Sequence, residues 1–565
     1  MKVVIVGGVA GGATAAARIR RLDEHAEITV FERSGYISYA NCGLPYYIGD
    51  VITDPEELTL QDPESFYARF RVDMKVRHEV TAIDPERHCV RVKDLETGAE
   101  FEEAYDKLLL SPGARPTQPR LAGTDLEQVF ALRTVEDTFR IKNYVNQNKP
   151  RSAVLAGGGF ISLELAENLR ELGLDVTIVQ RPTQVMNPFD PEMAAFIHGA
   201  LRRGGVRLAL GQTVEGFKPG AEGNIEVLLK NAAPLHADMV VLAIGVTPDT
   251  ALARVAGLEL GLKGSIVVND RMETSAPDIY AVGDAVQVRH LVTGADSVIS
   301  LAGPANKQGR IAADNICGRD SRYEGTLGSS VAKVFDVTAA STGVNETNAK
   351  KAGLDVDKLY LSPLNHAGYY PGGETMTMKI VFEKETWRLL GAQIVGGAGA
   401  DKRIDVLATA IQNGMDVRDL QTLQLAYAPP YGSAKDGVNM AGYMAENLAD
   451  GVVKQFHWHD VDALPRDGSV ILLDVRTPGE FKRGHFDGAV NIPVDELRER
   501  MDEIERGKPL YVNCQSALRS YIACRILSQN GFDCFNLAGG YRLYDVVMRD
   551  TEAKKTALPC GMEKQ

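Results

Sequence analysis

The chain twice repeats an apolar strand, a glycine-rich turn and a helix of small or apolar residues. The first copy spans Lys2–Arg21 and the second spans Ser152–Leu172. A short run of consecutive apolar residues that leads into glycines and then into a helix is typical of a buried parallel strand in an α/β domain. The pattern therefore predicts two doubly wound α/β domains that arose by duplication.

A third region, about Ser329–Met444, has a different pattern. It mixes predicted strands over Val331–Val337 and Thr375–Val381 with a helical pattern over Asp405–Asn413. It carries no glycine-rich phosphate signature. We expect an α+β domain that serves packing or oligomerisation.

A short α/β unit ends the chain. A linker is predicted near Phe456–Asp467, and the polar segment Thr551–Gln565 is predicted to be a loose tail. Between them apolar strands alternate with helices. The expected elements are strands Val470–Val475, Pro509–Cys514 and Cys534–Leu537 and helices Val494–Arg506 and Leu518–Gln529.

Composition excludes several classes of function. The 565 residues carry a net charge of -13 and a pI near 5.4, without a basic block, so we expect no nucleic-acid partner. No apolar run approaches the ~20 residues of a membrane span, and no signal-peptide core precedes the first strand. The seven cysteines lack paired spacing, which favours free thiols in the cytoplasm and predicts no metal site.

The first turn has the chemistry of a dinucleotide site. It reads Gly7-Gly8-Val9-Ala10-Gly11-Gly12, and Glu32 ends the next predicted strand. Glycines let the backbone approach a pyrophosphate at a helix N-terminus, and a carboxylate accepts hydrogen bonds from ribose hydroxyls. Val9 stands where a middle glycine is usual.

The second turn predicts a nicotinamide dinucleotide site. It reads Gly157-Gly158-Gly159-Phe160-Ile161-Ser162-Leu163-Glu164 and opens a helix. The next strand ends in Gln180-Arg181 rather than in an acid, so nothing repels a 2′-phosphate. Arg181 could pair with that phosphate or could simply be a surface arginine. The choice between NADH and NADPH stays open.

Cys42 follows the first turn in Asn41-Cys42-Gly43-Leu44-Pro45-Tyr46, and Tyr47 stands five residues on. A flavoenzyme with a Cys-x4-Cys pair stores electrons as an internal disulfide. A single thiol must form a mixed disulfide with an arriving sulfur or be oxidised to a sulfenate. We therefore expect the partner of Cys42 to be a small thiol.

Several segments resemble the FAD-dependent pyridine nucleotide-disulfide oxidoreductases. Thr274–Ala285 is similar to their second FAD motif, and Ser111–Ala114 and Ala243–Pro248 are similar to their crossovers between FAD and NAD domains. Around Cys42 the chain resembles the single-cysteine branch that contains coenzyme A-disulfide reductases. The resemblance implies FAD contacts from Gly7, Gly8, Ala10, Gly11, Glu32, Arg33, Val80, Ser111, Gly113, Asp284 and Ala302, and NAD(P)H contacts from Gly157, Gly159, Ile161, Glu164, Gln180 and Gly245.

Coenzyme A needs cations for its 3′-phosphate and pyrophosphate. Arg18 and Arg21 lie on one face of the first predicted helix, and Arg71 follows a short aromatic stretch. By resemblance Ser38 and Asn41 join Arg21 as substrate contacts. Solvated surface charge is the alternative for each arginine.

Two tyrosines complete the resemblance. Tyr369 and Tyr427 both lie beside proline-containing turns. In coenzyme A-disulfide reductases such tyrosines come from the dimer partner and can protonate the leaving thiolate. The resemblance therefore implies a homodimer with both tyrosines in the active site, whereas simple packing is the alternative role.

Cys514 ends a predicted strand and begins Cys514-Gln515-Ser516-Ala517-Leu518-Arg519 at a helix start. Backbone amides and the helix dipole favour a thiolate there. Together with Leu473–Phe481, Gly484–Pro493 and Leu537–Gly540, this loop resembles a rhodanese domain. The resemblance implies that the Cys-x4-Arg loop cradles a persulfide sulfur and that Arg519 contacts substrate.

As a whole, the resemblance implies that NAD(P)H and FAD drive reduction of coenzyme A persulfides, polysulfides and coenzyme A disulfides through Cys42, coupled to sulfur transfer at Cys514. An NADH oxidase or peroxidase with a Cys42 sulfenate, and a redox sensor or sulfur-relay carrier, are the alternatives. The expected domains are 1–118 and 246–326 for FAD, 119–245 for NAD(P)H, 327–446 for dimerisation, 455–550 for the rhodanese unit and 551–565 for the tail.

Overall fold

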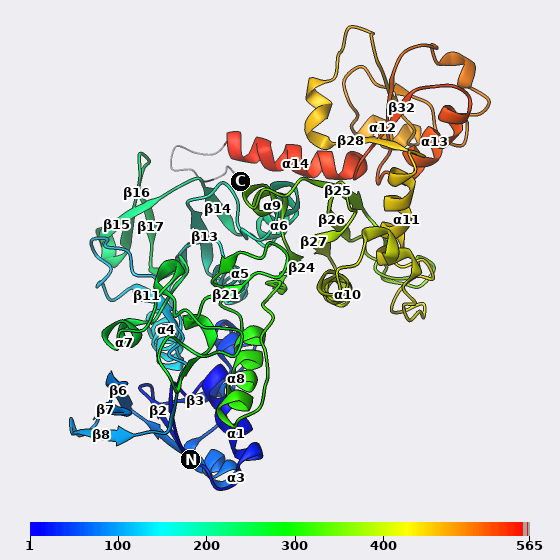
Figure 1. Cartoon of the computed structure of the whole chain (residues 1–565). Coiled ribbons are helices and arrows are strands. Elements are labelled where there is room, and N and C mark those ends of the chain that lie inside the picture. Colours follow the sequence, from blue (N-terminus) through cyan, green and yellow to red (C-terminus); the bar gives the residue numbers. More distant parts are fainter. Residues whose placement is uncertain (557–561, 563–565) are drawn as a thin grey trace. The chain divides into compact units, whose positions relative to one another are not determined.

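A computed structural model describes residues 1–556 and 562 (Figure 1). Its contacts divide the chain into two units. Residues 1–183 and 205–328 form the first, and residues 184–204 with the described residues from 329 onward form the second. No helix among the described residues is both long and apolar enough to cross a membrane.

The first unit contains a five-stranded parallel sheet in the order β20-β9-β1-β2-β5. Consecutive apolar residues form its strands because both faces are covered. The sheet and its helices are β1 (Lys2–Val6), α1 (Ala10–Leu22), β2 (Glu27–Glu32), β5 (Asp73–Val76), β9 (Lys107–Leu110), β20 (Ile279–Ala281) and α8 (Ala302–Ile316).

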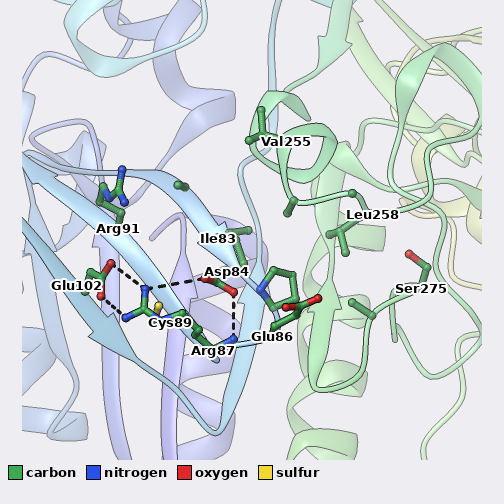
Figure 2. Close-up of a pocket in the computed structure, with 15 residues that line it drawn as sticks. Ile83, Asp84, Glu86, Arg87, Cys89, Arg91, Glu102, Val255, Leu258 and Ser275 are labelled. Atoms are coloured by element: carbon green, nitrogen blue, oxygen red, sulfur yellow. Dashed lines mark hydrogen bonds and ion pairs between the residues drawn. The ribbon is translucent and has the colours of Figure 1, made fainter.

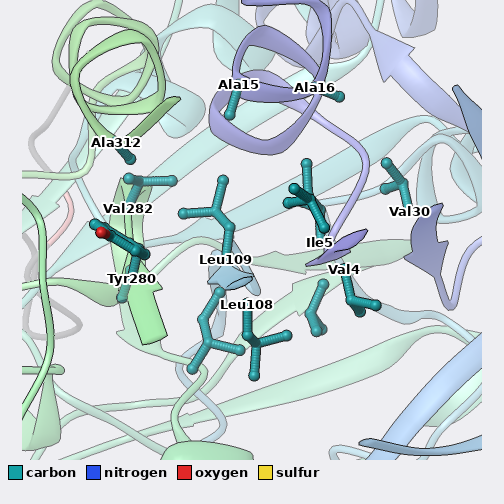
Figure 3. Close-up of a cluster of buried hydrophobic side chains, with 14 of the residues drawn as sticks. Val4, Ile5, Ala15, Ala16, Val30, Leu108, Leu109, Tyr280, Val282 and Ala312 are labelled. Atoms are coloured by element: carbon teal, nitrogen blue, oxygen red, sulfur yellow. The ribbon is translucent and has the colours of Figure 1, made fainter. Parts of the chain in front are cut away.

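Small residues let α1 and α8 pack closely over the core of this sheet. Figure 3 shows Ala15 and Ala16 of α1 above Leu109 of β9, with Ala312 of α8 beside them. A Cβ added at Gly309 would lie 2.4 Å from the carbonyl oxygen of Gly11, so neither helix tolerates a larger side chain at this contact. The packing fixes the N-terminus of α1.

A second five-stranded parallel sheet follows in the order β11-β18-β12-β13-β14. The antiparallel pair β10-β19 lies where the crossovers were expected. The elements are β10 (Ala114–Pro116), β11 (Val129–Ala131), α4 (Val135–Asn148), β12 (Ser152–Ala156), α5 (Phe160–Glu171), β13 (Asp175–Gln180), β14 (Arg207–Leu210), β18 (Met239–Leu242) and β19 (Val246–Pro248).

Smaller elements complete the first unit. They include the antiparallel sheets β6-β7-β8 and β15-β16-β17. Their bounds are β3 (Ile37–Tyr39), α2 (Leu44–Ile48), β4 (Thr59–Gln61), α3 (Pro63–Phe70), β6 (His78–Asp84), β7 (Cys89–Asp94), β8 (Glu100–Ala104), β15 (Val214–Pro219), β16 (Ile225–Leu229), β17 (Leu235–Ala237), α7 (Ala251–Val255), β21 (Val288–Arg289) and β22 (Asp296–Ser297).

The second unit begins with a five-stranded antiparallel sheet in the order β23-β24-β27-β26-β25. The prediction of one strand over Val331–Val337 is wrong, because Phe335 has a positive φ of 52° and turns the chain into a β23-β24 hairpin. The elements are α6 (Pro191–Arg203), β23 (Ser330–Val334), β24 (Val337–Gly343), α9 (Glu346–Lys351), β25 (Val356–Leu361), β26 (Thr377–Glu383), β27 (Leu389–Gly396), α10 (Ala400–Gln412) and α11 (Gly437–Ala449).

The chain then forms a five-stranded parallel sheet in the order β28-β32-β31-β29-β30. Three expectations fail here. The predicted linker contains the end of edge strand β28 and a 3₁₀ turn, and residues 551–555 of the predicted tail extend helix α14; most of the tail lies outside the described residues. The elements are β28 (Lys454–Phe456), β29 (Ile471–Asp474), α12 (Pro478–Arg483), β30 (Val490–Asn491), β31 (Leu510–Asn513), α13 (Leu518–Gln529), β32 (Cys534–Leu537) and α14 (Gly540–Lys555).

The predicted helix Val494–Arg506 is the third failure. Its apolar residues are spaced as in a helix, yet they form successive turns and a 3₁₀ helix over Met501–Glu503. Most bonds there join residues three apart, such as Leu497 to Val494 and Glu503 to Arg500. Turns bury the same apolar residues, so periodicity alone could not distinguish the two.

A buried ion network holds α6 against β26. Lys379 is fully buried, and its amine contacts the carboxylates of Asp190 at 2.7 Å and of Glu192 and Glu346. Burial lowers the pKa of Lys379, but the three carboxylates outweigh it and raise the pKa above its usual value. The amine therefore stays charged and partly offsets the negative charge of the three carboxylates, and Lys358 adds a second cation beside Glu346.

Lys379→Met should destabilise the second unit by about 3–5 kcal/mol, because it leaves the buried carboxylates of Asp190 and Glu192 without a counter-charge. Thermal unfolding measures this loss. Lys384→Met is the matched control, since Lys384 is about half exposed beside Asp355 and its pair contributes at most about 1 kcal/mol. Equal effects of the two substitutions would contradict the assignment.

Candidate active site

The first glycine turn is so tight that Gly7 and Gly12 have no room for a side chain. Gly7 has a φ of +98°, and a Cβ added at Gly12 would lie 1.9 Å from the carbonyl oxygen of Gly7. The amide of Gly8 donates to the Glu32 carboxylate at 2.9 Å, so Glu32 lies beside the turn. Ala10 and Gly11 then begin α1. The turn fits the phosphates and ribose of a dinucleotide.

Asp284 lies in a 3₁₀ turn after β20 and pairs with Arg133 at 2.8 Å. The sequence analysis missed Arg133, because nothing in the chain marks a pair 151 residues apart. The other residues expected to contact FAD occupy varied positions. Ser111 and Gly113 follow β9, Ala302 begins α8, Val80 is buried in β6, and Arg33 pairs with Asp249 at 2.8 Å.

The second glycine turn also fits a dinucleotide. Gly157 has a φ of +120°, and an added Cβ would lie 2.2 Å from the carbonyl oxygen of Ala243. A Cβ at Gly159, which caps α5, would meet no atom within 4 Å, so space lies open at the helix N-terminus. Ile161 and Glu164 lie on α5, Gln180 ends β13, and Gly245 has a φ of +108°.

Cys42 lies in a 3₁₀ turn over Asn41–Gly43 that leads directly into α2. Two interactions hold the other end of α2. The buried amine of Lys142 donates to the carbonyl of Ile48 at 2.9 Å. A Cβ at Gly49 would lie 2.1 Å from the Asn168 side chain, so α5 passes close by. Helices α4 and α5 therefore fix the segment that carries the thiol.

Glu164 sets the electrostatics around this thiol. Although Cys42 is exposed, protein atoms desolvate its sulfur, and this desolvation raises the pKa of the thiol; the Glu164 charge raises it further, while Arg133 lowers it. Desolvation raises the pKa of Glu164 itself to about 7. Glu164 therefore changes its charge near neutral pH beside the candidate nucleophile.

Arg20, a buried arginine that the sequence did not single out, joins the two helix ends that carry Arg21 and Arg71. Arg20 donates to the carbonyls of Phe70 and Arg71, both at 2.8 Å, and so ties the end of α1 to the end of α3. Arg71 lies over the Tyr67 ring at 5.2 Å. Arg21 and Arg71 therefore belong to two helix ends that Arg20 joins.

Arg18 has a structural partner. It pairs with Asp314 of α8 at 2.8 Å, and both side chains are largely buried. Its substrate contact remains a prediction. Ser38 has a positive φ of 43°, and its amide donates to the carbonyl of Gly8 at 2.9 Å, which links the segment leading to Asn41 with the first glycine turn.

Tyr369 and Tyr427, in the second unit, share a hydrogen bond of 2.6 Å between their hydroxyls. Both rings are exposed, at 76% and 45%. The hydrogen bond with Tyr369 raises the pKa of Tyr427, so Tyr427 keeps its proton at neutral pH. Two exposed hydroxyls in contact can pass one proton to a sulfur that leaves nearby.

Cys514 is fully buried at the start of its loop. The hydroxyl of Ser520 donates to the Cys514 sulfur at 3.3 Å, and Asn536 donates to the carbonyl of Ala517 at 3.2 Å. Ala517 has a φ of +70°, a conformation that turns the loop tightly. The sequence analysis missed Ser520, although it directly follows the arginine of the Cys-x4-Arg pattern.

Arg519 forms an ion pair with Glu480. Its guanidinium makes two bonds to that carboxylate, at 2.8 and 2.7 Å. The bonds from Arg519 lower the pKa of Glu480 to about 2, so the pair is charged at every physiological pH. Contact between Arg519 and substrate remains a prediction.

A hollow of about 530 Å³ in the first unit is separate from these residues (Figure 2). It lies between the β6-β7 hairpin and the residues after α7. Arg87 there pairs with Glu102 at 2.8 Å. Since the hollow contains no predicted site residue, it does not change the assignment of the active site.

Comparisons with known proteins decide the family. The model of the pyridine nucleotide-disulphide oxidoreductase family matches residues 1–309, its dimerisation domain matches residues 329–436, and a rhodanese-like domain matches residues 457–545. The chain belongs to the pyridine nucleotide-disulphide oxidoreductase family. Membership confirms the predicted fold class and the prediction of FAD and NAD(P)H as cofactors.

Similar proteins within this family carry informative names. A coenzyme A disulfide reductase of Staphylococcus aureus is 37% identical over 446 residues, which cover 79% of this chain and all of the relative. The structure of reduced Bacillus anthracis CoADR-RHD is 47% identical, has a TM-score of 0.93 and covers 97% of this chain and 98% of its own. An NAD-dependent persulfide reductase from A. fulgidus is 38% identical, has a TM-score of 0.90 and covers 96% of this chain and all of its own.

Replacing Glu164 should make Cys42 more reactive at neutral pH. Glu164→Gln removes the negative charge that opposes thiolate formation, so the pKa of Cys42 should fall and its alkylation by iodoacetamide should accelerate. The alkylated Cys42 peptide is quantified across neutral pH. Glu171→Gln, at the exposed end of α5, is the matched control. An unchanged pH profile in Glu164→Gln would refute the coupling.

Proposed function

We propose that this enzyme reduces coenzyme A persulfides, polysulfides and coenzyme A disulfides with electrons from NAD(P)H, and that its rhodanese unit handles sulfane sulfur. The observation that carries the proposal is one thiol, Cys42, beside a dinucleotide turn in a chain that also holds a second thiol, Cys514, in a Cys-x4-Arg loop. The names of the coenzyme A disulfide and persulfide reductases support it.

The sulfur chemistry follows from a single nucleophile. The Cys42 thiolate attacks the coenzyme A-bound sulfur of a persulfide, forms a Cys42–coenzyme A disulfide and expels hydrosulfide. With coenzyme A disulfide the same attack expels a coenzyme A thiolate. FAD, when bound along the Gly7–Gly12 turn, supplies the two electrons from NAD(P)H that reduce the mixed disulfide. Arg133, whose charge lowers the pKa of Cys42, favours the attacking thiolate.

The leaving sulfur needs a proton. We assign that role to the hydrogen-bonded pair Tyr369 and Tyr427, which we place in a homodimer at the active site of the opposite subunit. The match of residues 329–436 to a dimerisation domain supports the dimer. Arg21, Arg71, Ser38 and Asn41 are assigned to coenzyme A, and the free thiols lead us to place the enzyme in the cytoplasm.

An oxidase is the main rival. A water-forming NADH oxidase from Lactobacillus brevis is 30% identical, with a TM-score of 0.76, and covers 80% of this chain and all of its own. An oxidase would cycle Cys42 through a sulfenate and has no evident use for Cys514. The activities of Cys42→Ser and Cys514→Ser with each substrate therefore distinguish an oxidase from a persulfide and disulfide reductase.

Cys42→Ser should lower turnover with both coenzyme A disulfide and polysulfide at least about a hundredfold, while NAD(P)H still bleaches the flavin. Cys514→Ser should lose turnover only with polysulfide, because coenzyme A disulfide has no sulfane sulfur to transfer. NAD(P)H oxidation and sulfide release are measured, with Cys317→Ser at the end of α8 as the control thiol. Near-normal coenzyme A disulfide reduction by Cys42→Ser would contradict the proposal.

Shared active sites predict complementation. Cys42→Ser and Tyr427→Phe chains, each nearly inactive alone, should recover about a quarter of wild-type activity when mixed equally and exchanged. Half of the dimers are then mixed, and each mixed dimer has one intact site of two. Subunit exchange is verified by native mass spectrometry. Demonstrated exchange without recovered activity would argue against tyrosines supplied by the opposite subunit.

A further inference from the structure

Two further thiols lie in the rhodanese unit, in contact with each other and buried. Cys524 on α13 and Cys534 on β32 are 2% and 6% exposed. The thiol of Cys534 donates to the backbone carbonyl of Cys524 at 3.3 Å, and both side chains belong to one buried core cluster. A cysteine sulfur in contact with the backbone of another cysteine lies within the short range over which a disulfide can form.

The pair continues inward from Cys514. Ser520, which donates to the Cys514 sulfur, lies on α13 one helical turn before Cys524. Residues four apart share a helix face, so Cys524 follows Ser520 along the buried side of α13. Cys514, Cys524 and Cys534 accordingly belong to one core cluster. The three thiols therefore lie in one buried region of the rhodanese unit.

We propose that Cys524 and Cys534 form a thiol–disulfide switch that the Cys514 persulfide oxidises; the inference rests on the proposed sulfur-handling function of Cys514. Cys524 attacks the outer sulfur of the Cys514 persulfide, expels the Cys514 thiolate and becomes a persulfide itself. Cys534 attacks the inner sulfur of Cys524 and expels hydrosulfide. The two thiols lose two electrons, and one sulfane sulfur gains them and leaves as sulfide with the two thiol protons.

The disulfide would act on the loop that loads sulfur. It joins α13, whose first turn carries Arg519 and Ser520, to β32. Asn536 of the same strand holds the Ala517 carbonyl of the loop. Cross-linking these elements restrains the loop when sulfane sulfur arrives faster than NAD(P)H removes it.

Peptide mapping tests the switch in the full-length protein. The reduced protein is incubated with inorganic polysulfide without NAD(P)H, alkylated and digested with trypsin without reduction. Because Arg519, Arg525 and Arg542 separate them, Cys514, Cys524 and Cys534 fall in three different peptides. We expect a cross-link between the peptides 520–525 and 526–542, with one sulfide released per cross-link.

Two variants isolate the steps. Cys534→Ala should abolish the cross-link while the Cys514 peptide still carries a persulfide. Cys514→Ser should abolish the cross-link with polysulfide. A wild-type rate of cross-linking in Cys514→Ser, or a persulfide on wild-type Cys514 without any cross-link, would overturn the switch alone. Absence of both the cross-link and a persulfide on wild-type Cys514 would overturn the proposed function and the switch with it.

Discussion

A disulfide needs two sulfur atoms, and the segment Asn41–Tyr47, which follows the first dinucleotide turn in the sequence, carries one. Tyr47 occupies the position at which a Cys-x4-Cys enzyme carries its second thiol. We infer that Cys42 depends on sulfur that arrives from outside, and the residues around it bear on that chemistry. Lys142 and Asn168 fix the short helix that carries it, while Glu164 and Arg133 act on its charge in opposite directions.

Some of the arginines predicted to contact substrate already form ion pairs with carboxylates of the protein. Arg18 is paired with Asp314 and Arg519 with Glu480. A paired cation is partly neutralised and gives less to an anionic ligand. Arg21 and Arg71, on the helix ends that Arg20 joins, are the better candidates for the phosphates of coenzyme A.

Local patterns predicted the elements that a few consecutive residues determine. The strand–turn–helix units at Gly7 and Gly157 and helix α13 are present where they were expected, because glycine conformation and apolar runs act over short distances. Residues 494–506 were mispredicted since turns can bury the same apolar side chains as a helix. The hairpin at Phe335 was missed because no glycine or asparagine marks its turn.

The candidate sites show the same limit. Glycines and cysteines marked both dinucleotide turns and both candidate redox thiols, but the residues that pair with the site residues were missed. Arg133 pairs with Asp284, and Glu480 pairs with Arg519, only once the chain has folded. The hydrogen bond from Arg20 to the backbone after α3 likewise joins residues that are far apart in the sequence. The sequence also did not predict the contact between Cys524 and Cys534, because these residues are ten positions apart and lie on different elements.

The mass of the Cys42 peptide tests the central claim most directly. The enzyme is incubated with excess coenzyme A persulfide without NAD(P)H, then digested without reduction. The account predicts a coenzyme A adduct on Cys42 that disappears when NAD(P)H is added. A Cys42 peptide that carries only a sulfenic or sulfinic acid, with no coenzyme A adduct under any condition, would contradict it.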